Sequence, residues 1–260
     1  MIREEEGPPV WLKPAFPTIG SSDRVRKCGW LSWTCHEQAD VNRQMMLFRN
    51  RRHAGHLLAR KLSVYKNKHP LVLGIPRGAV PMAKVIADAL RGDLDVVLVH
   101  KLSHPEEIEL AIGAIDDSGN AILTDYAAQV DPEYLESEKQ RQLGALRQRR
   151  ARYTPLRSPI DLQARIVIVV DDGVATGSTM VAALRAVRAS TPKELIAAMA
   201  VASPDAVQAI ARECDAAFCL KVPSKFHAVG QFFADFAQVE DEEVISVLQH
   251  GQAQPRSAAG

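Results

Sequence analysis

The fold of this chain is decided by the stretch Val169-Val170-Asp171-Asp172-Gly173-Val174-Ala175-Thr176-Gly177-Ser178-Thr179-Met180. An apolar strand ends in two carboxylates, passes through a loop of small and hydroxylated residues, and enters a helix. The glycines let backbone N–H groups and hydroxyls approach a phosphate at the helix N-terminus. The adjacent acids suit two ligand hydroxyls, a metal ion, or both. A Walker nucleotide loop is excluded, because three residues separate the glycines instead of four and no lysine follows.

Strands and helices alternate on both sides of this stretch. Strands are expected at 71–75, 96–99, 165–170, 195–201 and 216–220, and helices at 50–65, 81–91, 179–189 and 205–212. A charged helix is expected at 131–153, and two short strands at 111–115 and 121–124 flank an Asp-Asp-Ser-Gly-Asn turn. The alternation predicts an α/β fold with a mainly parallel central sheet flanked by helices, in which ligands bind at the carboxyl ends of the strands.

The composition is that of an ordinary globular protein. The 260 residues carry 32 Lys+Arg against 31 Asp+Glu, a formal net charge of +1, and 47% are hydrophobic. This balance excludes a generally basic nucleic-acid binder and a disordered chain. Four scattered cysteines indicate a reduced compartment, and every apolar run is far shorter than the ~20 residues of a spanning helix. We therefore expect a cytoplasmic protein that binds neither nucleic acid nor a membrane.

The two ends of the chain differ from its middle. Residues 1–45 hold all three tryptophans and show no helical or strand period, so we expect an irregular or loosely packed extension there. Cys28, Cys35 and His36 lack a fourth ligand and fit no zinc-finger spacing, so a metal site is not expected. Residues 251–260 are expected to form a flexible tail. Residues 46–250 then form the folded domain.

The segment from Asp171 to Thr179 resembles the 5-phosphoribosyl 1-diphosphate (PRPP) motif of type I phosphoribosyltransferases, and in detail a bacterial group labelled only as predicted phosphoribosyltransferases. The resemblance runs from about 48 to 248. It implies the type I fold with a small hood, mainly at 222–238. It also implies that Asp171 and Asp172 contact the ribose hydroxyls and, through them or through water, Mg²⁺. The 5-phosphate role falls on Ala175, Thr176, Gly177, Ser178 and Thr179.

Two further loops extend the resemblance. Arg77 and Gly78 follow the 71–75 strand, where this family has its pyrophosphate-binding loop. Residues 101–114 correspond to the mobile loop that closes over PRPP, with Lys101 as a phosphate partner and Glu109 as a contact to the acceptor or the metal. The family usually has an Arg-Lys pair at this spot, and here His100 precedes Lys101. A neutral histidine would attract pyrophosphate less, or it is simply an edge residue of a strand.

The hood selects the acceptor in this family. Phe226, Phe232 and Phe233 are candidates to stack on a flat base, although aromatic residues at such a place also close the core. Several purine-specific relatives have an Asp where this chain has Ala175, which puts a hypoxanthine or guanine acceptor in doubt.

The implied activity is Mg²⁺-dependent transfer of the phosphoribosyl group of PRPP to a nitrogenous base or a related small acceptor, with release of pyrophosphate. We expect a homo-oligomer, in the form of a dimer. Two other hypotheses stay open: a regulator that binds PRPP or a nucleotide without turnover, and an RNA-contacting protein. The RNA hypothesis rests only on five arginines, with no acid among them, between 141 and 152. A solvated helix face or a subunit contact is the simpler interpretation of that cluster.

Overall fold

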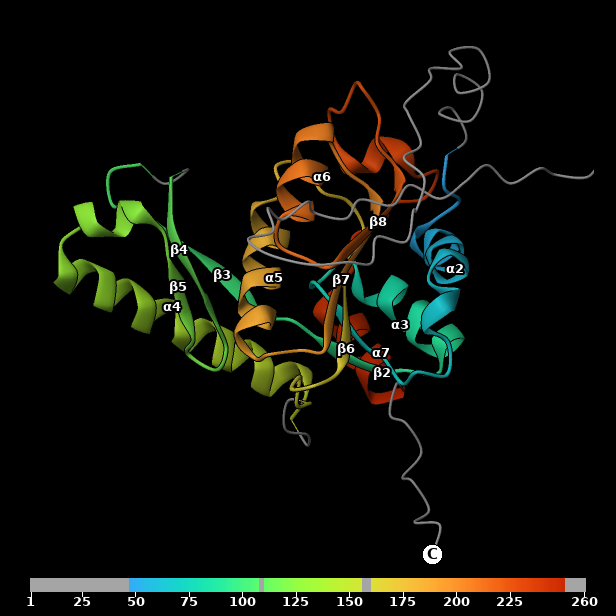
Figure 1. Ribbon diagram of the computed structural model, residues 1–260, viewed down its shortest axis with the longest axis horizontal. Helices are drawn as coiled ribbons and strands as arrows, with labels where there is room; N and C mark the ends of the chain where they lie inside the picture. The colour runs from blue at the N-terminus through green and yellow to red at the C-terminus, as the bar shows by residue number, and fades with distance from the viewer. Residues whose placement is uncertain (1–46, 108–109, 156–159, 251–260) are drawn as a thin grey trace, which may run out of the picture.

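A parallel five-stranded sheet runs through the centre of the computed structural model, which describes residues 47–107, 110–155 and 160–250 (Figure 1). Its strands are β1 (Leu71–Gly74), β2 (Asp93–Val96), β6 (Ile166–Asp171), β7 (Glu194–Val201) and β8 (Ala216–Lys221). They lie in the order β2-β1-β6-β7-β8, and every neighbouring pair is parallel. The predicted α/β fold with a parallel central sheet is confirmed.

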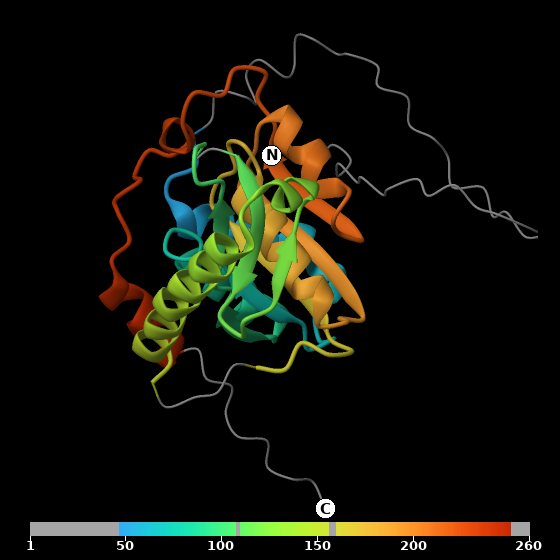
Figure 2. The same ribbon diagram turned by 90° about the vertical axis from the view of Figure 1, so that its left-hand side faces the viewer.

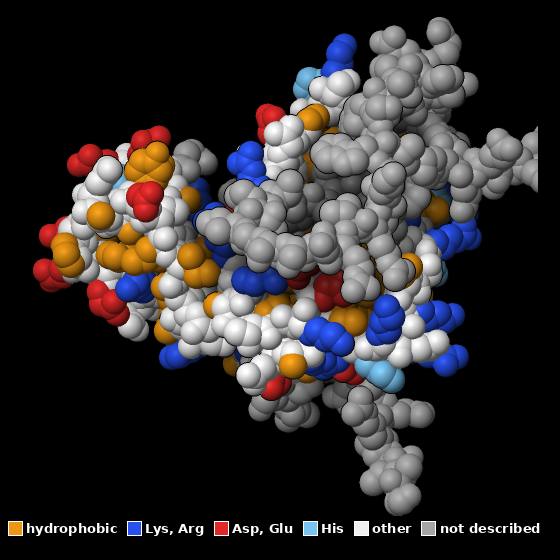
Figure 3. Space-filling view, viewed as in Figure 1, with side chains coloured by type: hydrophobic (Ala, Val, Ile, Leu, Met, Phe, Trp, Pro, Cys, Tyr) orange, Lys and Arg blue, Asp and Glu red, His pale blue; other side chains and the backbone are white. Residues whose placement is uncertain are grey.

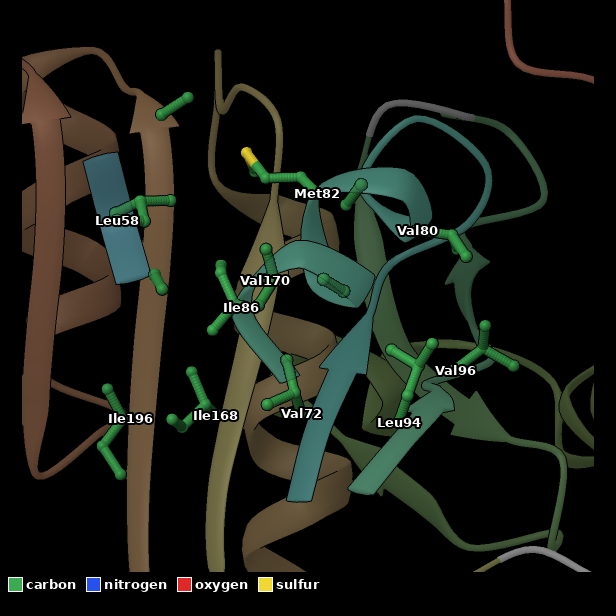
Figure 4. Close-up of a cluster of buried hydrophobic side chains, with 14 of the residues drawn as sticks. Leu58, Val72, Val80, Met82, Ile86, Leu94, Val96, Ile168, Val170 and Ile196 are labelled. Atoms are coloured by element: carbon green, nitrogen blue, oxygen red, sulfur yellow. The ribbon is translucent and has the colours of Figure 1, made fainter. Parts of the chain in front are cut away.

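Helices cover both faces of this sheet (Figure 1). On one face lie α2 (Arg51–Lys61), α3 (Val80–Leu90) and α7 (Asp241–His250), and on the other lie α5 (Ser178–Ala189) and α6 (Pro204–Ala211). Figure 4 shows Val72, Ile168 and Ile196 directed into the first of these two layers. Their neighbours along the strands, such as Leu73 and Val169, are buried in the second layer. Because both faces are covered, the strands read as continuous apolar runs in the sequence.

A smaller antiparallel sheet lies beside the central one (Figure 2). It consists of β3 (Val99–Ser103), β4 (Ala111–Asp116) and β5 (Ala121–Leu123), and it packs against α5 and against the long helix α4 (Pro132–Tyr153). Short 3-10 turns are present at η1 (Ser63–Tyr65), η2 (Asp125–Gln129) and η3 (Val229–Phe232). The predicted hairpin at 111–124 and the charged helix at 131–153 are confirmed.

Two predictions about the segment 93–114 need correction. The strand expected at 96–99 lies earlier, at Asp93–Val96, because its two aspartates are compensated by ion pairs: Asp93 with Arg165 and Asp95 with Arg150. The mobile loop expected at 101–114 is shorter, since 99–103 and 111–116 pair as antiparallel strands. Only 104–110 connects them, and Glu109 lies outside the described residues.

The C-terminal part contains a helix that the sequence did not reveal. Helix α7 begins with Asp241, Glu242 and Glu243, and acids in the first turn suit the positive end of a helix. Arg152 of α4 pairs with Asp241 at 2.7 Å and with Glu242 at 2.7 Å, and the Tyr153 hydroxyl donates to Asp241 at 2.6 Å. Helix α7, which follows the expected hood in the sequence, is thus bonded to the end of α4.

Within the described ranges no helix combines the length and the apolar character that crossing a membrane requires. The predicted domain boundaries stay predictions. Both the 1–45 extension, with its cysteines and histidine, and the 251–260 tail lie outside the described residues.

Candidate functional site

The loop between β6 and α5 lies at the carboxyl edge of the central sheet and is fixed by backbone bonds. Val174 pairs with Ala202 as an isolated parallel bridge, and its N–H donates to Val201 O at 2.9 Å. Ser203, at the start of α6, donates its hydroxyl to Ala175 O at 2.7 Å. Gly177 has φ +88°, a left-handed conformation that glycine adopts without strain. These bonds therefore define the shape of the loop.

This fixed loop presents polar groups to solvent at the first turn of α5. Ala175, Thr176, Ser178 and Thr179 are all exposed, and the Thr176 and Ser178 hydroxyls lie 2.9 Å apart. The N-terminus of a helix attracts anions, because its first N–H groups have no partner within the helix. The exposed hydroxyls and the helix N-terminus are thus present in the predicted phosphate loop (175–179), and its role in binding phosphate stays a prediction.

The acid pair stands immediately before the phosphate loop. Asp171 ends β6, and its Oδ1 accepts a bond from Asp172 N at 2.9 Å. Burial, and secondly the neighbouring Asp172 carboxylate, raises the pKa of Asp171 well above its ordinary value. Asp172 is 8% exposed. Two adjacent carboxyl groups, one with a raised pKa, at the end of a buried strand make this place a candidate binding site.

Asp172 is contacted by a basic residue that the sequence did not indicate. Arg51, the first residue of α2, places Nε 2.6 Å from Asp172 Oδ2. The guanidinium also donates to Ala237 O at 2.6 Å and lies 3.8 Å from the centre of the Phe236 ring. In the sequence, Arg51 is simply the arginine that follows the helix cap Asn50, so no local pattern could have predicted its contact with Asp172.

The turn after β1 closes on the same carboxylate. A Cβ added to Gly78 would lie 2.3 Å from Asp172 Oδ2 and 2.9 Å from its Cγ, so only glycine fits there. The preceding Pro76–Arg77 peptide bond is cis. Arg77 is exposed, and its guanidinium lies 3.1 Å from Glu240 Oε2. The structure therefore brings the expected pyrophosphate turn and the acid pair together.

Lys101 lies on the other side of the phosphate loop. It lines a hollow of about 300 Å³ together with Val99, His100, Ala182 and two residues of the phosphate loop, Ser178 and Thr179. His100 is exposed, and its Nδ1 lies 2.8 Å from Lys101 O. An ammonium and two hydroxyls around one hollow suit a phosphate group.

The hood packs against Gly173, the residue that follows the acid pair. The Val229 side chain lies where a Cβ at Gly173 would be, at 2.1 Å. Phe232 and Phe233 are buried, and Phe226 packs at a tilt against Phe232 with ring centres 5.6 Å apart. In this structure these rings close the core, so their role in binding an acceptor stays a prediction.

The arginines between 141 and 152 are largely compensated. Arg141 pairs with Glu138, and Arg150 with Asp95 and Asp117, while Arg152 contacts the acids of α7. On the face seen in Figure 3, acidic side chains gather over the N-terminal end of α4. The cluster therefore has the contacts of a structural helix, and the RNA hypothesis gains no support from it.

Metal and nucleophile candidates are few among the described residues. These residues contain no group of three or more His, Cys, Asp and Glu side chains placed to hold a metal ion. Mg²⁺, however, usually takes one or two protein carboxylates and completes its shell with water and substrate phosphates, which Asp171 and Asp172 fit. Burial raises the pKa of Cys214 to about 11 and of Cys219 to about 12, so neither thiol is ionised at neutral pH.

Comparison with known proteins agrees with this geometry. A family model described as "Phosphoribosyl transferase domain" matches residues 44–236. Two curated proteins of Mycobacterium tuberculosis, strains CDC 1551 and H37Rv, each described as "Putative phosphoribosyl transferase", are 38% identical over 207 residues, which is 78% of this chain and 47% of theirs. This chain thus spans about half the length of those relatives. The crystal structure of TT1426 from Thermus thermophilus is 42% identical with a TM-score of 0.75, covering 80% of this chain and 100% of that one.

Proposed function

The chain belongs to the phosphoribosyl transferase domain family, and on this premise we propose that it transfers the 5-phosphoribosyl group of PRPP to a nitrogenous acceptor, with Mg²⁺, and releases pyrophosphate. One observation supports the proposal above all others. The acid pair, the phosphate loop and the Arg77–Gly78 turn meet at one edge of the sheet, so ribose, 5-phosphate and pyrophosphate groups have adjacent partners.

Each part of PRPP then has a partner of matching chemistry. The phosphate loop binds the 5-phosphate, and Asp171 and Asp172 accept bonds from the ribose hydroxyls. Arg77 and Lys101 offer positive charge to the pyrophosphate, Arg77 through a planar guanidinium that can donate two parallel bonds. Mg²⁺, when bound, would be held by the two acids through the ribose hydroxyls or water, and would neutralise charge on the pyrophosphate.

The residues of the chain act by position and charge and form no covalent bond to the substrate. The bond from ribose C1 to the pyrophosphate oxygen breaks as an acceptor nitrogen attacks the opposite face. Arg77 and Lys101 stabilise the charge that grows on the leaving pyrophosphate. The hood would limit access of water, which otherwise attacks C1 in place of the acceptor.

The decisive experiment incubates the protein with PRPP, Mg²⁺ and a panel of purine and pyrimidine bases and follows pyrophosphate release. We expect release that depends on one acceptor. PRPP binding without turnover for any base would favour the regulatory hypothesis instead. Absence of PRPP binding in calorimetry would contradict both.

Lys101 carries a prediction of its own. We expect Lys101→Ala to weaken PRPP binding by about tenfold, because one charge-assisted bond is lost. Calorimetry with pyrophosphate alone should show a similar loss, since pyrophosphate is the group assigned to Lys101. Lys193→Ala is the matched control, because Lys193 is exposed and precedes β7 at the opposite edge of the sheet. A loss confined to ribose 5-phosphate would instead assign Lys101 to the 5-phosphate end of the hollow it shares with Ser178 and Thr179.

A further inference from the structure

Arg51 joins two parts of the site that are far apart in the sequence. Its Nε donates to Asp172 Oδ2 at 2.6 Å, and its terminal nitrogen donates to Ala237 O at 2.6 Å. The same guanidinium lies over the Phe236 ring at 3.8 Å. One planar group therefore contacts the ribose-binding acid and the C-terminal end of the hood at once.

The contact with Asp172 is shielded from solvent. The side chains of Arg51 and Asp172 are 11% and 12% exposed, so the pair is weakened little by water and salt. Gly78 also lies close to this carboxylate, since a Cβ added there would be 2.3 Å from Oδ2. The Arg51 bond and the nearby pyrophosphate turn together fix the position of Asp172 Oδ2. The orientation of the carboxylate, and with it the direction of Asp172 Oδ1, follows from these two contacts.

The contact with the hood is equally specific. The Phe236 ring packs at a tilt against Phe233 with ring centres 4.9 Å apart, and Phe233 packs at a tilt against Phe48 at 5.2 Å. The Phe48 backbone bonds to the hood on both sides, through Phe232 O and Ala234 N, each at 2.8 Å. Because the guanidinium is rigid and planar, a shift of the hood at Phe236 shifts the group that holds Asp172.

We propose that Arg51 is a positioning residue that couples the hood to the orientation of Asp172, so that PRPP binding sets the hood for the acceptor. The inference rests on the proposed function. Asp172 cannot turn toward a ribose hydroxyl without moving the guanidinium, and the guanidinium cannot move without disturbing Phe236 and Ala237. Binding of the ribose at Asp172 therefore changes the position of the hood at Phe236, through the Arg51 guanidinium.

The first test measures PRPP affinity with Mg²⁺ by calorimetry. Arg51→Gln should bind about tenfold more weakly than wild type, because Asp172 loses its charge-assisted partner. Arg51→Lys keeps the charge and should stay within about threefold of wild type. Arg52→Gln is the control, since Arg52 is the next residue of α2 and is exposed. Its binding should equal that of wild type, which excludes a general effect of helix charge.

The second test follows the hood by ¹⁹F NMR of protein labelled with 4-fluorophenylalanine. The Phe236 signal is assigned as the one that Phe236→Leu removes. It should shift when wild type is saturated with PRPP and no acceptor, and it should not shift in Arg51→Lys, because an ammonium cannot reproduce the planar contacts. A merely structural arginine would not change this response.

The outcomes separate the two proposals. If wild type binds PRPP but Arg51→Gln binds equally well, or if the Phe236 signal is static or shifts equally in Arg51→Lys, the coupling is refuted and the proposed function stands. If wild type does not bind PRPP at all, the proposed function is refuted, and the coupling with it.

Discussion

Asp171→Asn is expected to weaken binding of PRPP with Mg²⁺ by about 10- to 100-fold and to leave the fold at least as stable as before. Binding falls because the amide has a single acceptor oxygen, which already bonds Asp172 N, and presents an NH₂ group where the carboxyl group offers a second oxygen to a ribose hydroxyl or to Mg²⁺. Stability does not fall, because burial and the neighbouring Asp172 already disfavour the ionised form of Asp171. Asparagine removes that cost and can still accept the bond from Asp172 N.

Asp172→Asn should weaken binding to a similar degree but lower the free energy of unfolding, by about 1–3 kcal/mol. The reason is Arg51, whose guanidinium would lose its shielded partner at 2.6 Å. The two neighbouring acids are therefore expected to agree in their effect on binding and to differ in their effect on stability. Calorimetry with PRPP and chemical denaturation of both variants measure the two quantities.

The pH dependence of stability gives an independent check on Asp171. An acid whose pKa is raised in the folded state binds more protons there than in the unfolded chain. The free energy of unfolding therefore falls as pH rises from about 4, the ordinary carboxyl pKa, toward the raised value. This fall should be smaller in Asp171→Asn. If Asp171→Asn binds PRPP like wild type, or is much less stable than wild type, the role assigned to Asp171 is contradicted.

The sequence predicted the fold, and it indicated the centre of the candidate site, because both depend on local patterns. Apolar runs at β1, β6, β7 and β8 are strands buried on both faces, and the alternation with helices leaves few topologies. The residues from Asp171 to Thr179 are contiguous, so one loop brings acids, glycines and hydroxyls together. Their meeting with Arg77 and Gly78 then follows from the shared carboxyl edge of adjacent parallel strands.

The rest depends on contacts between distant segments, which no local pattern records. Arg51 and Asp172 are 121 positions apart in the sequence. Strand β2 contains two aspartates, which pair with Arg150 and Arg165. Because these acids make the segment polar in the sequence, its true start was not predicted. The arginines of α4 looked unopposed for the same reason, because several of their partners lie on β2, in the β4–β5 turn and on α7.

The net charge of +1 is also compatible with the proposed polyanionic ligand. Most arginines of the described site and of α4 are matched by acids. Recognition of phosphate would depend on backbone N–H groups, hydroxyls, a few placed cations and Mg²⁺. Little net charge is needed, and the composition alone could not show the site.

Gly78→Ala is expected to abolish measurable PRPP binding at micromolar ligand and to cost about 1–3 kcal/mol of stability. The new Cβ would lie 2.3 Å from Asp172 Oδ2 and 2.9 Å from Asp172 Cγ. A long flexible side chain could turn away, but Asp172 is short and its Oδ2 is held by Arg51. The carboxylate itself must therefore move, which removes it from the ribose hydroxyls while most of the core stays intact.

Gly144→Ala is the matched control, because nothing lies within 4 Å of a Cβ at that position of α4. Alanine there should raise the free energy of unfolding by about 0.5–1 kcal/mol, as glycine is costly inside a helix, and PRPP binding should not change. Denaturation and calorimetry of the two variants therefore separate a general effect of alanine from the local clash. Full PRPP binding by Gly78→Ala would show that Asp172 does not need the position it has against the pyrophosphate turn, and would remove that turn from the site.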